Sequence, residues 1–261
     1  MVSGAAIVMT LVMMISAGCR ADRPGRPTPE SDFTRETAVF ATVASLDYGA
    51  AAAAYGSLDS LFYRLRTTTT ERDEAGQMLA SEARTFAMSP QGGILEDMST
   101  EGTLSTGFMT FATSGDSIPD QGQDLAELWA PVQPAFASVR NREYYRYSGA
   151  ADTMLAGESC EVYLIEAVED APAEKIPIRR VRLVVARSDS AVIGIELSRR
   201  DDALVYEESS TVEVVLLRGD MGRFVPLKRK IDVTVRPPLR RTHRFTTTQE
   251  YVYDFADEVP G

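Results

Sequence analysis

Apolar and polar residues alternate along the C-terminal half of the chain, and this pattern predicts β-strands. In residues 244–253 the alternation places four side chains on one face: Phe245, Thr247, Tyr251 and Tyr253. Similar runs predict further strands at 143–148, 158–167, 179–187, 191–198, 211–217 and 224–235. The connections between these runs are short, whereas a parallel crossover needs about a dozen residues or more. We therefore expect the strands to pair in an antiparallel manner.

The N-terminal half mixes helical and strand patterns. Residues 38–61 are rich in Ala, which predicts one or two helices broken near Gly49 or Gly56. Residues 62–72 and 77–88 predict a hairpin around a turn at 73–76. Glycines recur through 91–123, which predicts a short strand near Ile94 followed by a mobile flap. Residues 124–138 begin as a helix that Pro131 ends or kinks.

These elements together predict an α+β fold built on one large antiparallel sheet of about 9–11 strands. Strongly twisted open sheets rarely exceed about 10 strands, so a sheet of this width must curl or close. We therefore predict a large curved sheet with helices packed on its concave face. In this interpretation residues 36–261 form a single domain.

The first residues have the pattern of a bacterial lipoprotein signal. Residues 1–18 carry no charged side chain, and their apolar run covers residues 5–15. A helix of that length rises about 16 Å, which is too short for a hydrocarbon core of about 30 Å. The segment Ser16-Ala17-Gly18-Cys19 then resembles a lipobox, where a peptidase cuts before the cysteine and the cysteine receives acyl chains. We predict a lipoprotein signal peptide at 1–18 and a lipid anchor at Cys19.

The next residues read as a tether. Residues 20–35 hold three Pro, one Gly and seven charged side chains, a composition that cannot bury a core. We predict a lipid-anchored tether at 19–35, which would hold the protein at a membrane through acylated Cys19. The alternative is an ordinary secretory signal with an incidental cysteine. If Cys19 is acylated, Cys160 has no disulfide partner within the chain and reads as a small buried residue.

The order of elements, together with the lipobox, is similar to the LolA/LolB-like superfamily over about residues 40–255. Hairpins such as YRYSGAADTMLAGESCEVYLIEA at 145–167 carry this resemblance. It implies an unclosed half-barrel with a helical lid, in an outer-membrane lipoprotein that faces the periplasm of a bacterial envelope. It also implies a cavity for acyl chains or a lipidated partner. For each candidate lining residue plain core is the favoured alternative; the candidates are Phe108, Phe111, Trp129, Phe136, Tyr145, Tyr147 and Tyr163.

Charge is distributed unevenly along the chain. The whole protein carries 27 Lys and Arg against 38 Asp and Glu, a net charge of −11, yet residues 218–244 hold nine cations against two acids. One interpretation is a patch that docks an anionic headgroup or a protein partner, formed by Arg223, Lys228, Arg229, Lys230, Arg240 and Arg241. The other is cross-strand pairing with acidic neighbours. Nucleic-acid binding is not expected of an acidic envelope protein.

The sequence contains few residues of the types that form catalytic or metal sites. One His and two Cys exclude most His/Cys metal sites and most catalytic relays. Residues 114–118 resemble the nucleophile block of the GDSL hydrolases around Ser117, but that family needs an Asp three residues before its His. Here Arg240 stands three residues before His243, which we expect to be a solvated strand residue. We therefore expect no enzyme activity, cofactor or metal.

Two functions follow from these patterns. The first is a non-enzymatic, lipid-anchored envelope protein whose curved sheet binds acyl chains or a lipidated partner. The second is a structural or regulatory interaction module of the same fold, with a filled core and no ligand cavity. The composition fits either, since 44% of residues are hydrophobic and 25% charged.

Overall fold

The computed structural model describes residues 29–104, 134–149, 152–202, 207–219, 223–236 and 242–253. The predicted signal peptide, most of the tether and the flap lie outside these ranges. So do Ser117 and several predicted site residues, namely Cys19, Phe108, Phe111, Trp129, Arg240 and Arg241.

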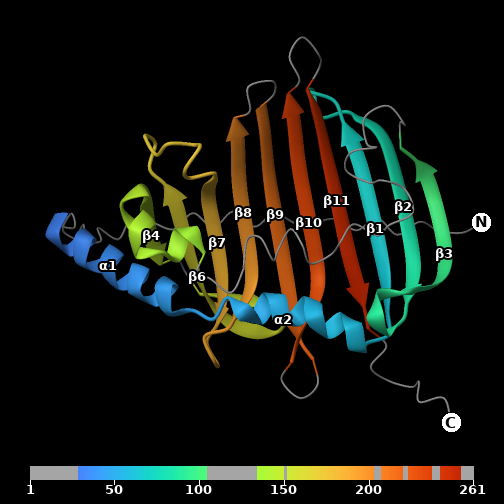
Figure 1. Cartoon of the computed structure of the whole chain (residues 1–261), viewed down its shortest axis with the longest axis horizontal. Helices are drawn as coiled ribbons and strands as arrows, with labels where there is room; N and C mark the ends of the chain where they lie inside the picture. Colours follow the sequence, from blue (N-terminus) through green and yellow to red (C-terminus); the bar gives the residue numbers. More distant parts are fainter. Residues whose placement is uncertain are drawn as a thin grey trace, which may run out of the picture.

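Eleven antiparallel strands form one sheet (Figure 1). They are β1 (Tyr63–Arg72), β2 (Met78–Met88), β3 (Ile94–Thr103), β4 (Tyr145–Gly149), β5 (Thr153–Leu155), β6 (Glu158–Ala167), β7 (Ile178–Ala186), β8 (Val192–Asp202), β9 (Glu207–Arg218), β10 (Phe224–Arg236) and β11 (His243–Val252). Their order across the sheet is β3-β2-β1-β11-β10-β9-β8-β7-β6-β4, and β5 also pairs with β6. β3 and β4 therefore stand at opposite ends, and the sheet does not close. The predicted α+β half-barrel of antiparallel strands is confirmed.

The first strand of the sheet pairs with the last. Leu65 of β1 lies opposite Tyr251 of β11, and Thr69 lies opposite Thr247. The predicted hairpin at 62–88 is thus joined to the C-terminal strand, and the rest of the sheet follows as a meander from β4 to β11. We call this β1–β11 pairing the seam.

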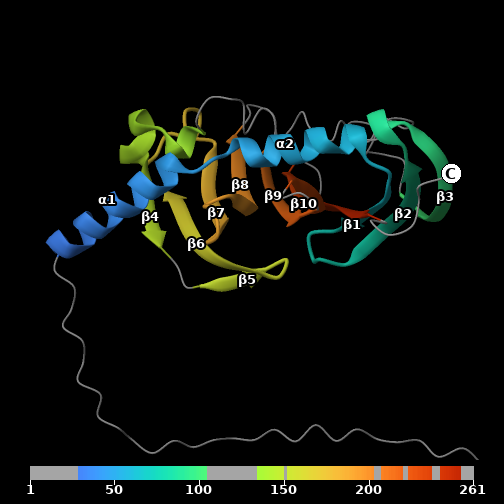
Figure 2. The ribbon, with the colours of Figure 1, turned by 90° about the horizontal axis from the view of Figure 1, so that it is seen from below.

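Two helices precede the sheet, α1 (Pro29–Ser45) and α2 (Gly49–Ser57), and the break between them falls at the predicted Gly49. α1 packs against β4, while α2 lies across one face of the sheet over β8 and β10 (Figures 1 and 2). α1 begins seven residues before the predicted domain boundary at 36, so residues 29–35 are helix rather than tether. Proline is favourable at a first helical position, which suits a helix that begins at Pro29. No helix among the described residues is long and apolar enough to cross a membrane.

Short 3-10 segments connect the larger elements. They are η1 (Leu58–Ser60), η2 (Pro90–Gly92), η4 (Ala135–Ala137) and η5 (Val139–Tyr144). η4 falls within residues 124–138, for which the sequence predicted a helix, and residues 124–133 of that prediction lie outside the described ranges.

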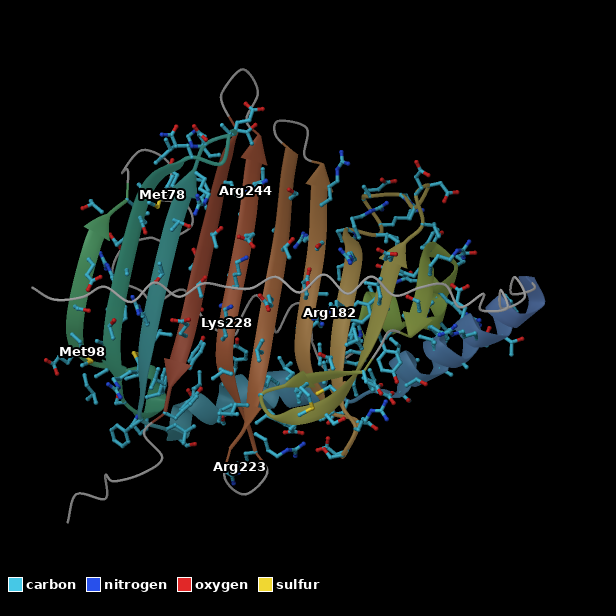
Figure 3. The ribbon with its side chains drawn as sticks, turned by 180° about the vertical axis from the view of Figure 1, so that it is seen from behind. Met78, Met98, Arg182, Arg223, Lys228 and Arg244 are labelled. Atoms are coloured by element: carbon cyan, nitrogen blue, oxygen red, sulfur yellow. The ribbon has the colours of Figure 1, made fainter. Side chains whose placement is uncertain are left out.

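The pleat divides the strand residues between two faces. Tyr55 of α2 meets Tyr251 with 6.3 Å between ring centroids, which places Tyr251 and its register partners on the side that we call the helix-covered face. The opposite side is the outer face, where Figure 3 shows Arg182, Lys228 and Arg244. The main apolar core lies on the helix-covered face.

β3 differs from the other strands because every residue in it is exposed. The sequence predicted only a short strand near Ile94, whereas the structure has ten residues, from Ile94 to Thr103. The β2–β3 pairing shifts register twice, between Thr85 and Phe86 and between Ala87 and Met88. Such bulges disrupt alternation, which explains why the strand was not evident from sequence.

Candidate functional site

The helix-covered face carries a continuous apolar surface on β6 to β9, which we call the aliphatic zone. The register aligns Ile165 with Val181, Val181 with Leu197, and Leu197 with Val212. A second row runs from Leu183 through Ile195 to Val214. The aliphatic zone therefore consists of Ile165, Val181, Leu183, Ile195, Leu197, Val212 and Val214, and all of these except the half-buried Val212 are buried.

The same face becomes polar at β10. Arg229 lies directly opposite Val214 in the register, and Gln249 lies opposite Arg229. Arg229 is only 1% exposed and Gln249 only 2%, and Thr69 and Glu71 of β1 are also buried. We call these four residues the polar zone. Buried polar groups are costly unless they are hydrogen-bonded, so the partners of these four residues decide whether the polar zone lowers stability.

Hydrogen bonds satisfy part of the polar zone. The hydroxyls of Thr69 and Thr247 lie 3.2 Å apart across the seam. Among the described residues, however, Gln249 Oε1 is buried and accepts no hydrogen bond. A buried amide oxygen without a donor costs about 1–3 kcal/mol. Gln249 therefore keeps a buried polar atom that no described residue satisfies.

Four tyrosines border the polar zone beneath α2. Tyr55 of α2 contacts Tyr251, and Tyr63 contacts both Tyr251 and Tyr253, with ring centroids 5.9 to 6.3 Å apart. Burial raises the pKa of Tyr55 to about 12, with the positive charge of Arg229 opposing the shift. Burial also raises the pKa of Tyr63 to about 12. These phenols are neutral at physiological pH and can act as hydrogen-bond donors.

His243 is not the solvated residue that its sequence context predicted. Its Nδ1 lies 3.0 Å from Oε1 of the buried Glu71, and its ring stacks on Phe245. The two partners are separated by 172 positions in the chain and meet only through the seam, so local sequence could not show the contact. No group of three or more His, Cys, Asp or Glu among the described residues could hold a metal ion.

Three of the predicted cavity residues lie in an aromatic cluster between α1 and β4. Phe136, Tyr145 and Tyr147 are all buried, and Phe40 of α1 meets Tyr147 edge to face at 5.1 Å. Tyr147 donates its hydroxyl to the Phe136 carbonyl at 2.8 Å, and Tyr145 donates to the Ile178 carbonyl at 3.2 Å. Burial raises the pKa of Tyr145 to about 12. These three residues therefore have the contacts of packed core.

Tyr163 stands apart from that cluster. It lies opposite Leu183, is half-buried, and donates its hydroxyl to Glu161 Oε2 at 2.6 Å. It therefore lies at the end of an aliphatic row, where a ligand on the aliphatic zone would reach it. Cys160 on the same strand is buried and free, and burial raises the pKa of its thiol.

The predicted cationic patch is divided between the two faces. Arg229 is buried on the helix-covered face because it alternates with Lys228 and Lys230, which lie on the outer face (Figure 3). Lys228 lies opposite Glu250, while Lys230 lies opposite Glu213 and contacts Asp232 at 2.7 Å. Arg223 is exposed just before β10. The two lysines thus have the acidic neighbours that the alternative interpretation expected.

A trough on the outer face brings together residues that the sequence analysis did not single out. Its lining comes from β11, β1, β2 and β3, and it encloses about 350 Å³. The lining residues are Arg64, Arg66, Ala83, Thr85, Ser99, Glu101 and Val252. Alternation in β1 predicts that Arg64 and Arg66 share a face, but the register shifts of β2–β3 hide their relation to Glu101. We call this feature the outer trough.

The fold and its helix-covered face define an unclosed antiparallel half-barrel with helices across one side, in the arrangement predicted from the resemblance to the LolA/LolB-like superfamily. No protein-family model matches the sequence, and no curated protein matches it either.

Solved structures show a distant similarity. A DUF1329 family protein from Desulfovibrio piger is 11% identical, with 86% of this chain and 95% of that chain covered and a TM-score of 0.28. A LolA superfamily protein from Nitrosomonas europaea is 7% identical, with 87% and 95% covered and a TM-score of 0.24. A chain in the complex of Pseudomonas aeruginosa MucA and MucB is 10% identical, with 77% and 92% covered and a TM-score of 0.21. Similarity at this level does not define the function of this chain.

Proposed function

We propose that this protein is a non-enzymatic, lipid-anchored protein of the bacterial envelope that binds acyl chains, or the acyl chains of a lipidated partner, on the aliphatic zone. The observation that carries the proposal is the continuity of that zone across β6 to β9 on the concave side of an unclosed sheet. Burying an acyl chain there would contribute about 0.8 kcal/mol per methylene group.

The width of the aliphatic zone sets the length of chain that it can hold. Four strands span three interstrand spacings, or about 14 Å, before Arg229 and Gln249 begin the polar zone. A chain lying across the strands would therefore stop at β10. Longer chains would have to turn along the strands, where Tyr163 marks the end of the row on β6.

The proposal predicts where an acyl probe would react. A fatty acid with a photoreactive diazirine, incubated with the full chain in mild detergent, is expected to label peptides from β6 to β9. Val212 and Val215 provide a matched pair of variants, because both are half-buried residues of β9 on opposite faces. Val212→Ser should reduce labelling severalfold, and Val215→Ser should leave it unchanged. Equal labelling of both variants, or labelling spread evenly over all strands, would reject the site.

A second function is favoured by the aromatic cluster. Phe136, Tyr145 and Tyr147, three of the candidate cavity residues, are buried, and the two tyrosines donate their hydroxyls to backbone carbonyls. A filled core of this kind suits a structural or regulatory module that acts through its surface. A protein that takes up no acyl probe at all would support this second function.

The proposed anchor has its own test, and the two cysteines form a natural control. Cys19 is proposed to receive acyl chains at an outer membrane, facing the periplasm. Cys160 is buried, and this burial raises the pKa of its thiol. Labelled palmitate fed to bacteria that express the full chain should enter the protein. Cys19→Ser should abolish the label and release the protein from membranes, whereas Cys160→Ser should retain both. Label that persists in Cys19→Ser would contradict the anchor.

A further inference from the structure

The outer trough has walls of opposite charge. Arg64 and Arg66 stand on β1, Glu101 stands on β3, and β2 between them carries small side chains. The β1 and β3 backbones are two interstrand spacings apart, about 10 Å, which long side chains can bridge from both sides. The enclosed 350 Å³ falls within the range of small-ligand sites.

The floor of the outer trough offers hydroxyl groups between the charged walls. The register places Arg66, Thr85 and Ser99 in one row across β1, β2 and β3. The next row contains Ala83 and Glu101. Ala83 contributes no bulk, so the space between the guanidinium groups and the carboxylate stays open. A ligand in this space would meet cations, then hydroxyls, then an anion.

Four polar side chains of the outer trough are available to a ligand. Within the described ranges, the side chains of Arg66, Thr85, Ser99 and Glu101 make no hydrogen bond or ion pair. Other charged residues of the outer face differ in this respect, since Lys230 contacts Asp232 and Arg180 contacts Glu166. Glu250 lies opposite Arg66 in the register without forming an ion pair with it. Arg66 and Glu101 therefore carry complementary charges that are not used for internal pairing among the described residues.

We propose that the outer trough binds a zwitterion of the phosphoethanolamine type. Arg66 would hold the phosphate, because a guanidinium fork matches phosphate oxygens geometrically. Thr85 and Ser99 would donate hydroxyl hydrogen bonds to the same phosphate. Glu101 would accept hydrogen bonds from the ammonium group at the other end of the ligand. This site is independent of acyl binding on the helix-covered face.

Calorimetric titration of the full chain in nonionic detergent tests the proposal with three soluble probes: phosphoethanolamine, glycerol 3-phosphate and ethanolamine. Phosphoethanolamine should bind more tightly than either of the others, because only it has both charges. Arg66→Gln should lower the affinity for both phosphate compounds about threefold to tenfold. Glu101→Gln should lower the affinity for phosphoethanolamine alone, so that phosphoethanolamine no longer binds more tightly than glycerol 3-phosphate. Arg146→Gln, an exposed arginine of β4 at the far end of the sheet, should change nothing.

Two results would overturn the site: equal affinity of the wild-type chain for phosphoethanolamine and glycerol 3-phosphate, or an unchanged preference in Glu101→Gln. Circular dichroism of each variant separates loss of binding from loss of fold. Short-chain phosphatidylethanolamine added to the micelles then distinguishes the sources of the zwitterion. Binding of the lipid at least as tight as that of free phosphoethanolamine would support a membrane headgroup. Binding of the free compound alone would support a soluble metabolite.

Discussion

At the scale of single residues, Gln249 of the polar zone is a buried amide whose packing leaves one polar atom unsatisfied. Gln249 is buried, and its Oε1 accepts no hydrogen bond from the described residues. An apolar residue of similar length would remove the unsatisfied oxygen and keep the packing. Conserving volume while removing a polar atom is the change that buried sites tolerate best.

We therefore expect Gln249→Met to leave the free energy of unfolding unchanged or to raise it by up to about 1 kcal/mol. Gln249→Ala, which removes the packing as well, should lower it by about 1–3 kcal/mol. Urea denaturation of the three proteins measures both effects. A loss of more than 1 kcal/mol in Gln249→Met would mean that the amide is needed for stability, and that the polar zone is structural at this position.

A second residue-scale prediction concerns pH. Arg218 Nε lies 2.9 Å from Glu158, its terminal nitrogen lies 2.9 Å from Asp189, and its guanidinium covers the Phe224 ring. Burial raises the pKa of Asp189, but hydrogen bonds from Arg218 and the Ala191 amide outweigh this and hold the pKa below its ordinary value. A carboxyl group with a depressed pKa stabilises the fold above its unfolded pKa, and this stability is lost as the pH falls through its folded pKa.

Asp189→Asn should thus lower stability at pH 7 by about 0.2–1 kcal/mol, the range of a solvent-exposed ion pair. The difference from wild type should shrink as the pH falls below about 4, the ordinary pKa of an Asp carboxyl in the unfolded chain, toward the lower pKa of Asp189 in the fold. Urea midpoints at pH 7, 5 and 3 measure it. A difference that stays constant over this range would show that the charge of Asp189 is not responsible.

At the scale of elements, alternation and turn residues were enough to locate most strands. The predicted runs at 158–167, 179–187 and 224–235 agree with β6, β7 and β10 within one residue at each end. Sequence patterns did not predict the bounds of an element where a bulge or a helix-start preference determines them. β3 is longer than predicted because its register shifts break the alternation, and α1 starts earlier because Pro29 suits a first helical turn.

The attachment of β3 depends on one glycine. Gly102 has φ +80°, and a Cβ there would meet the Ser81 carbonyl oxygen at 2.2 Å. Gly76, in the β1–β2 turn, has the same φ with nothing within 4 Å. The two positions therefore separate the backbone strain that an added Cβ would cause from a collision with the neighbouring strand.

We expect Gly76→Ala to lower the free energy of unfolding by about 1–2 kcal/mol through backbone strain alone. Gly102→Ala should in addition detach β3, so that the amides of residues 94–103 exchange hydrogen faster while those of β6 to β9 do not change. Hydrogen exchange read by mass spectrometry measures this directly. Normal protection of 94–103 in Gly102→Ala would show that β3 can shift to accommodate the methyl group.

At the scale of the whole molecule, the sequence predicted the number of strands and the antiparallel pairing but not the sheet order. Short connections define neighbours such as β7 and β8, whereas nothing local indicates that β1 pairs with β11. The candidate site shows the same limit. The aliphatic rows could be anticipated from apolar strands, but the Glu71–His243 contact and the outer trough exist only because distant segments meet.

A cross-link tests the seam. Thr68 and Thr248 are register partners on the outer face, and paired antiparallel residues have a Cα separation of about 4.5–5.5 Å, which suits a disulfide. Thr68→Cys combined with Thr248→Cys should form a bond under oxidising conditions and raise stability by about 2–4 kcal/mol, reversibly on reduction. Thr68→Cys combined with Ser198→Cys of β8, several strands away, should not cross-link. Mass spectrometry and thermal unfolding report the two outcomes.

The seam also determines when the chain can complete its fold. β1 begins at Tyr63 and β11 at His243, so a ribosome that adds about 5–20 residues per second makes the last strand on the order of ten to forty seconds after the first. During that interval β1 to β3 have no neighbour on the β11 side, and the strand edge of β1 is open to any other chain. A nascent protein of this topology should need a chaperone that protects its N-terminal hairpin until synthesis reaches the C-terminus.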